Sequence, residues 1–345
     1  MKSIILERSP GRAGGEAVLT EMKTPRPGNG ELLVEMKACG LCGTDVEKIR
    51  GQYTAAMPVL GHEAVGVVAR LGSGVKGFEV GDRVFPHHHV PCHKCFYCRR
   101  GSETMCLRYR GSNIVPGGFS EFFIVPAWNV KGRRVLRLPS KVGFKECTMI
   151  EPVACCLRAL DRCKVHSGES VLIVGAGPVG LAHAIILRAM KSHVMVSDIS
   201  PERLSFAKKI GIKDALDPRE VDVEEAAKRL SGGRGADLAI VASGSPKATV
   251  QALKAVRRGG RVCLFGVPVK GSVLDYDFSD VFNSEVSVIT SYGATEAETA
   301  RALSLIGSKK INVSPLLTHR YRLEGFGEAL RVAAGGRGMK VVVTP

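Results

Sequence analysis

Residues from about 168 to 290 alternate between short apolar runs and helical patterns, and this alternation limits the possible folds more than any other feature. Five runs have the length and composition of buried strands: SVLIVG, HVMVSD, DLAIVA, RVCLFG and VSVITS. They are separated by helix-like segments such as PVGLAHAIILRAM, PERLSFAKKIG and PKATVQALKAVRRGG. Such alternation is typical of βαβ units with right-handed crossovers. The sequence therefore predicts an α/β unit with a doubly wound parallel sheet.

A glycine-rich turn, GAGPVG, directly follows the first of these strands and fits the G-x-G-x-x-G dinucleotide fingerprint. The first glycine permits a tight turn, the second lets the backbone approach a pyrophosphate, and the third lets the helix pack close to the strand. A strand precedes the turn and a helical pattern follows it, which is the context that the fingerprint requires. The expected cofactor-binding residues of the turn are Gly175, Gly177, Pro178, Val179 and Gly180.

Asp198 ends the next strand, 23 residues after Gly175, close to the spacing expected of a ribose-binding acid. Its carboxylate would accept hydrogen bonds from the ribose hydroxyls and repel a 2′-phosphate, which favours NAD over NADP. Arg203, five residues further on, lies where a basic residue would give some tolerance for NADP. The alternative is that the glycines are ordinary turn residues and Asp198 is a cap before Pro201.

Eleven cysteines in a chain of 345 residues do not indicate a disulfide framework, because such frameworks belong to short secreted chains and the count is odd. The stretch CHKCFYCRRGSETMC instead has metal-ligand spacing. Four thiolates saturate a zinc ion, and a closed site of this kind is structural. An iron–sulfur cluster uses the same ligands and remains an alternative, as does a redox disulfide pair. The four expected structural ligands are Cys92, Cys95, Cys98 and Cys106.

A second set of candidate ligands is scattered along the chain: Cys42 in CGLCGTD, His62 and Glu63 in GHEAVG, and Glu151 in IEPVACC. Taken one at a time these residues are weak signals, because a histidine or cysteine beside small residues is more often a core residue. Cys39 and Cys42 also form a C-x-x-C pair. We expect no helix-forming run after Cys42, which disfavours a thioredoxin-like dithiol.

The order of these motifs resembles the zinc-dependent medium-chain alcohol/polyol dehydrogenase family, in its sorbitol and threonine dehydrogenase-like branch. The resemblance runs nearly end to end, through PRPGNGELLVEMKACGLCGTD, GHEAVGVVARLGSGVKGFEVGDRV, the cysteine lobe, EPVACC, GAGPVG and KVVVTP. It implies a GroES-like β-rich catalytic domain beside a Rossmann domain. The expected boundaries are 1–150 for the catalytic domain, with the zinc lobe at about 88–110 and completion by 291–345, and 151–290 for the NAD-binding domain.

The resemblance also implies roles for individual residues. A catalytic zinc would be held by Cys42, His62 and Glu151, with Glu63 supporting or intermittently replacing a ligand. Asp45 would orient the zinc-bound histidine, and Thr44 would be the first proton acceptor. The implied reaction moves a hydride from a secondary alcohol or polyol, sorbitol-, inositol- or threonine-like, to NAD, with two zinc ions per chain.

The sequence departs from the family pattern at Glu47, where many relatives carry a histidine that passes the substrate proton to solvent. A carboxyl group relays protons near neutral pH only if burial raises its pKa. The alternative is that Glu47 points to solvent and pairs with Lys48 or Arg50. Cys155 and Cys156 are possible substitute ligands. The run His87 to His89 stays unassigned, because a strand cannot turn three consecutive side chains to one face.

Other classes of function fit less well. The net charge of +16 is scattered and not interleaved with aromatic residues, so we expect no nucleic-acid partner. No apolar run suits a membrane helix, and the first residues lack the apolar core of a signal peptide, so we expect a cytoplasmic protein without a membrane partner.

A zinc-independent quinone reductase should lack the cysteine lobe. A general alcohol dehydrogenase and an inactive NAD-binding relative remain alternatives, and zinc content would separate the latter. We expect a homo-oligomer, a tetramer or a dimer.

Overall fold

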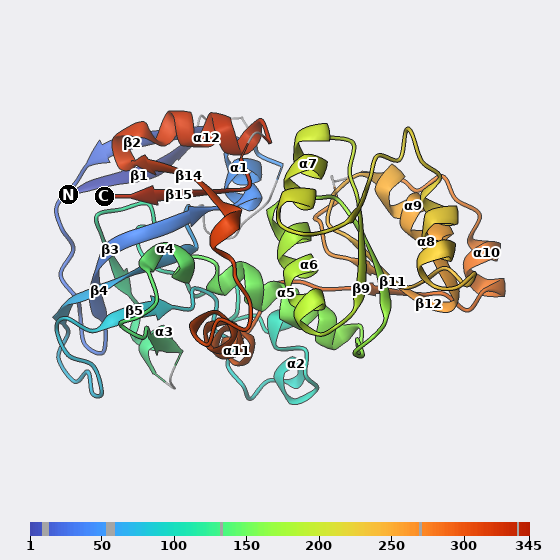
Figure 1. The fold of residues 1–345 in the computed structure, drawn as a ribbon. Coiled ribbons are helices and arrows are strands. Elements are labelled where there is room, and N and C mark those ends of the chain that lie inside the picture. Colours follow the sequence, from blue (N-terminus) through green and yellow to red (C-terminus); the bar gives the residue numbers. More distant parts are fainter. Residues whose placement is uncertain (9–13, 53–58, 132–133, 269–270, 337) are drawn as a thin grey trace. The chain divides into compact units, whose positions relative to one another are not determined.

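The computed structural model describes residues 1–8, 14–52, 59–131, 134–268, 271–336 and 338–345 (Figure 1). The chain divides into two compact units. The first unit contains residues 1–154 and 294–345, and the second contains residues 155–293. Within the described ranges, no helix has the length and apolar character needed to cross a membrane.

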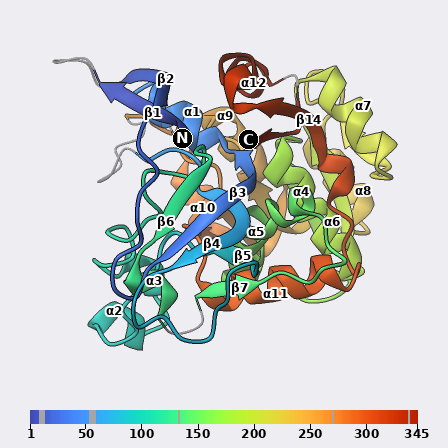
Figure 2. The ribbon, with the colours of Figure 1, turned by 90° about the vertical axis from the view of Figure 1, so that its left-hand side faces the viewer.

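The first unit is built on β-strands, and Figure 2 shows them from a second side. A two-stranded sheet pairs β1 (Lys2–Arg8) with β2 (Gly15–Glu21). A seven-stranded sheet has the order β14-β15-β3-β4-β5-β7, with β6 also paired to β3. Its strands are β3 (Leu32–Leu41), β4 (Glu63–Leu71), β5 (Arg83–Pro86), β6 (Phe122–Val125), β7 (Val135–Arg137), β14 (Leu317–Arg322) and β15 (Lys340–Thr344). The last strand therefore lies in the sheet of the first unit.

Short helices connect these strands. They are α1 (Gly43–Ile49), α2 (Phe96–Arg99), η1 (Glu103–Met105), α3 (Ala127–Val130), α4 (Phe144–Cys147), α11 (Glu296–Gly307), η2 (Ser314–Leu316), η3 (Leu323–Gly325) and α12 (Phe326–Ala334). The core lies along β3, whose residues are buried or half-buried throughout. Helix α12 packs on β14 and β15, and the ring of Phe326 lies 4.9 Å from that of Phe119. This packing fastens the C-terminal strand to the core near the candidate metal ligands.

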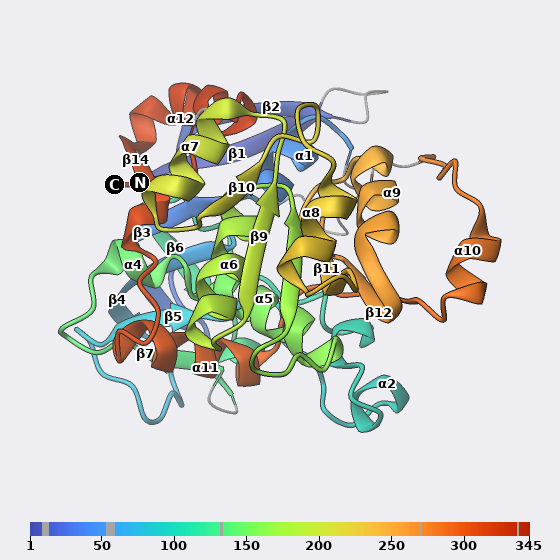
Figure 3. The ribbon, with the colours of Figure 1, turned by 45° about the vertical axis from the view of Figure 1, so that its right-hand side comes forward.

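The second unit is a six-stranded parallel sheet with helices around it (Figure 3). Its strand order, β10-β9-β8-β11-β12-β13, is the 3-2-1-4-5-6 order of the Rossmann fold. The strands are β8 (Ser170–Val174), β9 (His193–Ser197), β10 (Asp214–Leu216), β11 (Ala236–Val241), β12 (Val256–Leu264) and β13 (Ser287–Thr290). The helices are α6 (Pro178–Ala189), α7 (Pro201–Lys209), α8 (Val223–Leu230), α9 (Pro246–Ala255) and α10 (Phe278–Asn283), while α5 (Ile150–Arg162) spans the division between the units.

The predicted GroES-like and Rossmann architecture is confirmed, and all five predicted strands of the second unit are present. One predicted helix was too long. The segment from Pro246 was expected to be helical as far as Gly260, but α9 ends at Ala255 and β12 begins at Val256. The reason is tertiary, because Val256 pairs with Ala236 of β11. Gly259 also has φ +64°, which interrupts a helix.

Candidate functional site

The ends of three strands meet in the first unit and bring distant residues together. Gly40 near the end of β3 pairs with Glu63 at the start of β4 and, on its other side, with Val342 of β15. Cys42 follows β3 directly, and His62 precedes β4 directly. Antiparallel pairing therefore places Cys42 beside His62 and Glu63, although the sequence separates them.

Cys42, His62 and Glu63 form a group that can hold a metal ion. One donor atom from each residue lies within 4.8 Å of the other two. His62 and Glu63 are buried and Cys42 is half-buried. A thiolate, an imidazole and a carboxylate are the donors that zinc takes, so the chemistry of the set fits a zinc ion with a position left for a further ligand.

Asp45, in the first turn of α1, holds the backbone around Cys42 and His62 in place. Its Oδ2 accepts a hydrogen bond from the backbone N–H of Cys42 (3.1 Å), and its Oδ1 accepts one from that of Gly61 (3.0 Å). Oδ1 also lies 3.6 Å from Nδ1 of His62, an electrostatic contact rather than a hydrogen bond. Burial would raise the pKa of Asp45, but the charges of His62 and Lys48 and the hydrogen bonds lower that pKa to about 2. Asp45 is therefore ionised and favours an Nδ1–H tautomer that leaves Nε2 of His62 free for a metal.

Lys340 contacts this group and was missed in the sequence analysis. Its Nζ lies 2.5 Å from both carboxylate oxygens of Glu63, and the two side chains are 4% and 0% exposed. The residues are 277 positions apart in the chain. In the sequence, Lys340 stands before a run of valines, and this pattern predicts only the start of a strand. The one sign of a special role was a charged residue at the beginning of an otherwise apolar strand.

Glu151 and the neighbouring cysteines occupy different places. Glu151 is buried at the start of α5 and lies outside the 4.8 Å group, but its charge acts on Glu63 and on Lys340. Cys155 and Cys156 are not part of the group either, and they belong to the second unit. The thiol of Cys156 donates to the carbonyl oxygen of Val179 at 3.7 Å. The structure thus gives no support to Cys156 as a substitute ligand.

Thr44 and Glu47 lie on α1, close to the metal group. The Thr44 hydroxyl is 3.6 Å from the sulfur of Cys42. Glu47 is half-buried, and burial raises its pKa. The expected alternative partner, Lys48, instead donates to the carbonyl oxygen of Val59 at 2.8 Å. Among the described residues no ion pair of Glu47 is found. These surroundings favour the relay interpretation of Glu47 over the surface-charge one.

The three consecutive histidines are not in a strand, because β5 ends at Pro86. Their rings contact one another in sequence: His87 and His88 meet edge to face with centroids 5.5 Å apart, and His88 and His89 are tilted with centroids 4.1 Å apart. The ring of His88 also lies 5.1 Å from that of His62. Burial lowers the pKa of all three, that of His89 to about 3, so the imidazoles are neutral. The argument that a strand would turn the three side chains to different faces therefore does not apply. The three rings form a contiguous uncharged cluster beside the metal group.

The C-x-x-C pair needs one correction. Contrary to the expectation, a helix, α1, does follow Cys42. Its first turn is stabilised because the carboxylate of Asp45, at the third position of the helix, accepts a hydrogen bond from the backbone N–H of Cys42. The dithiol interpretation still fails. Burial raises the pKa of Cys39 well above its usual value, and its thiol donates to the carbonyl oxygen of Gly40 at 3.6 Å. Cys39 is thus a buried, unreactive thiol.

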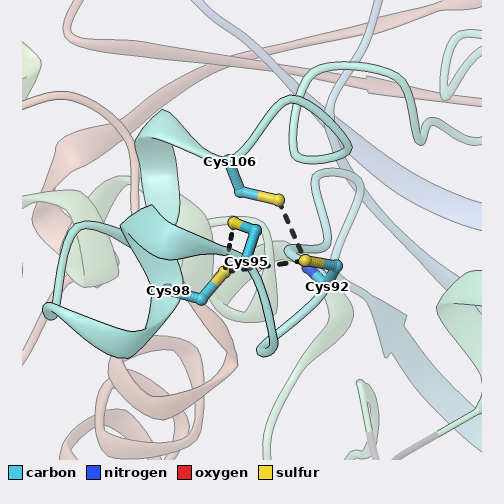
Figure 4. A group of neighbouring side chains, drawn as sticks. All are labelled: Cys92, Cys95, Cys98 and Cys106. Carbon is cyan, nitrogen blue, oxygen red and sulfur yellow. Dashed lines mark hydrogen bonds between the residues drawn. The ribbon is translucent and has the colours of Figure 1, made fainter.

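The four-cysteine lobe has the geometry of a closed metal site (Figure 4). The sulfur of Cys98 lies 3.5 Å from that of Cys95 and 4.0 Å from that of Cys92. A tetrahedron with Zn–S bonds of about 2.3 Å places its sulfurs about 3.8 Å apart, so the cage fits zinc. The pKa of Cys92 is lowered to about 6 because the backbone N–H of Lys94 donates to it. Nε2 of His93, within this lobe, contacts the carboxylate of Glu296 in α11, which joins the lobe to the rest of the first unit.

The glycine-rich turn of the second unit has the clearances that a dinucleotide needs. Gly175 follows β8 with φ +110°, and a Cβ on Gly180 would lie 1.9 Å from the carbonyl oxygen of Gly175. Gly177, in contrast, has open space, since only Nη1 of Arg203 lies at 4.0 Å from its ideal Cβ. Pro178 and Val179 open α6, whose N-terminus faces this space. The turn therefore fits a pyrophosphate at Gly177.

Asp198 ends β9 and is tied to the same turn. Its carboxylate accepts hydrogen bonds from the backbone N–H of Ala176 (2.6 Å) and of Ser200 (2.9 Å). Nη1 of Arg203 lies 3.7 Å from Oδ2 of Asp198. An acid and a base therefore stand side by side next to the glycine-rich turn.

Comparisons with known proteins show the family to which the chain belongs. Residues 28–139 match the family model of the alcohol dehydrogenase GroES-like domain, and residues 178–308 match that of the zinc-binding dehydrogenases. The chain is 32% identical to sorbitol dehydrogenase of Halalkalibacterium halodurans over 336 residues, 96% of each protein. It is 34% identical to L-threonine 3-dehydrogenase of Pyrococcus horikoshii over 352 residues, 98% of this chain and 97% of that protein.

The fold has a close counterpart among solved structures. A zinc-binding dehydrogenase of Sinorhizobium meliloti bound to NADP superposes with a TM-score of 0.87 and 27% identity, over 100% of this chain and 99% of that one. The chain belongs to the zinc-dependent medium-chain dehydrogenase family, and it is an oxidoreductase of the zinc-binding alcohol, polyol and threonine dehydrogenase class.

Proposed function

We propose that the protein oxidises a secondary alcohol or polyol, transferring a hydride to NAD with the help of a zinc ion held by Cys42, His62 and Glu151. The observation that carries this proposal is that Cys42 and His62 lie together at the ends of β3 and β4, with an ionised Asp45 behind the histidine. Glu151 is the third ligand that the family resemblance implies. Sorbitol and L-threonine, the substrates named for two relatives, both have a secondary hydroxyl beside another polar group.

When bound, a zinc ion would supply a Lewis acid that lowers the pKa of the substrate hydroxyl, and NAD would supply the hydride acceptor. The chain's own residues hold the groups and move the proton. Asp45 keeps His62 in the tautomer that can ligate, and the cysteine lobe fixes the backbone through Cys92 to Cys106. Thr44 receives the substrate proton first. Its hydroxyl is a weak base, so it must pass the proton on, and Glu47 is the acceptor that α1 offers nearby.

NAD is the proposed coenzyme because the carboxylate of Asp198 would repel a 2′-phosphate. Arg203, 3.7 Å from that carboxylate, limits the strictness of this choice. We also infer two zinc ions per chain, one structural and one catalytic. A cytoplasmic location is supported by the state of the thiols, since all eleven cysteines are free and the four in the lobe must stay reduced to hold a metal.

A substrate panel tests the proposal. Secondary alcohols, polyols, inositols, L-threonine and primary alcohols would be offered with NAD, and NADH formation would be followed while zinc is counted by mass spectrometry. We expect about two zinc ions per chain and turnover of at least one secondary hydroxyl. One zinc ion per chain and no turnover would indicate a binding protein that has kept only its structural site.

A further inference from the structure

We propose that Lys340 is a positioning residue that turns the Glu63 carboxylate toward itself and thereby keeps Glu63 from closing the catalytic metal site. The inference rests on the proposed metal binding at Cys42 and His62. It concerns which of two carboxylates, Glu63 or Glu151, is held away from the metal when substrate is absent.

The contact between Lys340 and Glu63 engages the whole carboxylate. Both of its oxygens lie 2.5 Å from Nζ, so its open edge faces the ammonium group. Within the described ranges, Nζ of Lys340 has no other hydrogen-bond partner. Lys340 is 3% exposed, and a buried ammonium group without a partner is strongly unfavourable. Each charge is thus stable at this position only while it faces the other.

Gly40 makes this contact possible. Glu63 and Lys340 belong to the two strands that flank β3, and their side chains meet across β3 at Gly40. An ideal Cβ at Gly40 would lie 1.9 Å from Oε2 of Glu63 and 2.9 Å from Cε of Lys340. No side chain larger than hydrogen fits there. Because Gly40 has no side chain, there is room above it for the lysine to contact the carboxylate.

The charge of Lys340 decides what Glu63 can do. Glu63 has a donor atom within 4.8 Å of donors from Cys42 and His62, which is close enough to share a metal with them. Without the ammonium group, the part of the chain that the structure describes offers this buried carboxylate no other ion pair, so the metal would attract it. A carboxylate added to Cys42, His62 and Glu151 would complete four ligands and leave no position for substrate. With Lys340 present, that position stays open.

Cobalt(II) and imidazole provide a test that does not depend on turnover. The purified full-length protein would be loaded with Co²⁺, and imidazole would be titrated while the visible spectrum of the metal is followed. Imidazole changes the spectrum only where a coordination position is open, so the closed four-cysteine site does not respond. In Lys340→Met we expect imidazole to bind about ten- to a hundredfold more weakly than in the parent protein. Lys340→Arg, which keeps the charge, should bind imidazole like the parent.

The double variant Glu63→Gln/Lys340→Met removes both buried charges and serves as the decisive control. We expect it to keep its cobalt and to recover parental imidazole binding, because no carboxylate is left to close the site. Unchanged imidazole binding in Lys340→Met would overturn the proposal. Loss of cobalt from the double variant would overturn it as well, because Glu63 would then be a required ligand. A parent protein that shows no imidazole-responsive cobalt at all would instead contradict the proposed catalytic metal site itself.

Discussion

At the scale of single residues, Glu47 is the side chain whose surroundings change its chemistry most clearly. Burial raises its pKa, and Lys48, the neighbour that might have neutralised it, is bound to the carbonyl oxygen of Val59. A carboxylate is a better proton acceptor near neutral pH when its pKa is raised toward that pH. The group accepts a proton only when ionised, so relay through Glu47 should fail as the pH falls through its raised pKa.

Glu47→Gln should therefore lower alcohol oxidation roughly tenfold or more at neutral pH and regain activity at high pH, where hydroxide takes the proton. Glu47→His should restore the neutral-pH rate. The measurement is the pH profile of turnover for the parent and both variants. Thermal stability is the control. Because burial disfavours the ionised form, the glutamine variant should melt no lower than the parent at neutral pH. Profiles that superimpose across the whole range would leave Glu47 without a relay role.

Asp198 and Arg203 are the residues that we expect to decide the choice of coenzyme. The parent protein should use NAD at least about tenfold more efficiently than NADP, because the carboxylate of Asp198 repels a 2′-phosphate. Asp198→Asn removes the charge but keeps one acceptor for the backbone N–H of Ala176. It should raise the efficiency with NADP, since Arg203 is then free to bind the phosphate. Steady-state kinetics with both coenzymes measure this, and Asp198→Asn/Arg203→Ala should lose the gain. Equal efficiency of the parent with both coenzymes would contradict the prediction.

At the scale of elements, the two metal-binding segments differ in how they are built. The four-cysteine lobe draws all its ligands from residues 92–106, around the short helix α2 and the turn η1. So short a segment has little core of its own, and metal binding would supply folding free energy. Two of the proposed catalytic ligands, Cys42 and His62, lie at the ends of β3 and β4, which strand pairing and the core hold in place.

Cys95→Ser should therefore lower the thermal unfolding midpoint by about 5 °C or more and release one zinc ion. His62→Ala should abolish turnover but leave the melting temperature and the affinity for NAD nearly unchanged. Calorimetry, zinc counting and NAD titration measure these effects. A Cys95→Ser protein that stays stable and zinc-replete but loses turnover would show that the two roles are reversed.

At the scale of the whole molecule, apolar side chains remain exposed around the edge of the second unit's sheet. Val273 is 82% exposed, Phe282 in the helix before β13 is 83% exposed, and β13 is one of the two edge strands of this sheet in the described part of the chain. Open strand edges with apolar neighbours favour pairing with another chain, and a strand can pair antiparallel with its own copy about a two-fold axis. These features support the expected homo-oligomer.

Light scattering coupled to size-exclusion chromatography should find the parent as a dimer or tetramer. Phe282→Glu should shift it toward smaller species, because a charge would be buried in the contact. The matched control is Val80→Glu, which changes a 65% exposed apolar residue of the first unit and should leave the assembly intact. A parent protein that runs as a monomer at every concentration would contradict the prediction.

The sequence by itself determined the Rossmann unit, the four-cysteine cage and the coenzyme turn, because each depends on residues close together in the chain. Periodicity, ligand spacing and glycine position are local properties. The scattered site at Cys42 and His62 was inferred only through resemblance to a family. Tertiary structure alone decided that Lys340 meets Glu63 across Gly40, since the pairing of both β15 and β4 with β3 brings together two residues that are 277 positions apart. It also decided that Glu47 is half-buried, because burial depends on what packs around a helix and not on the residues within it.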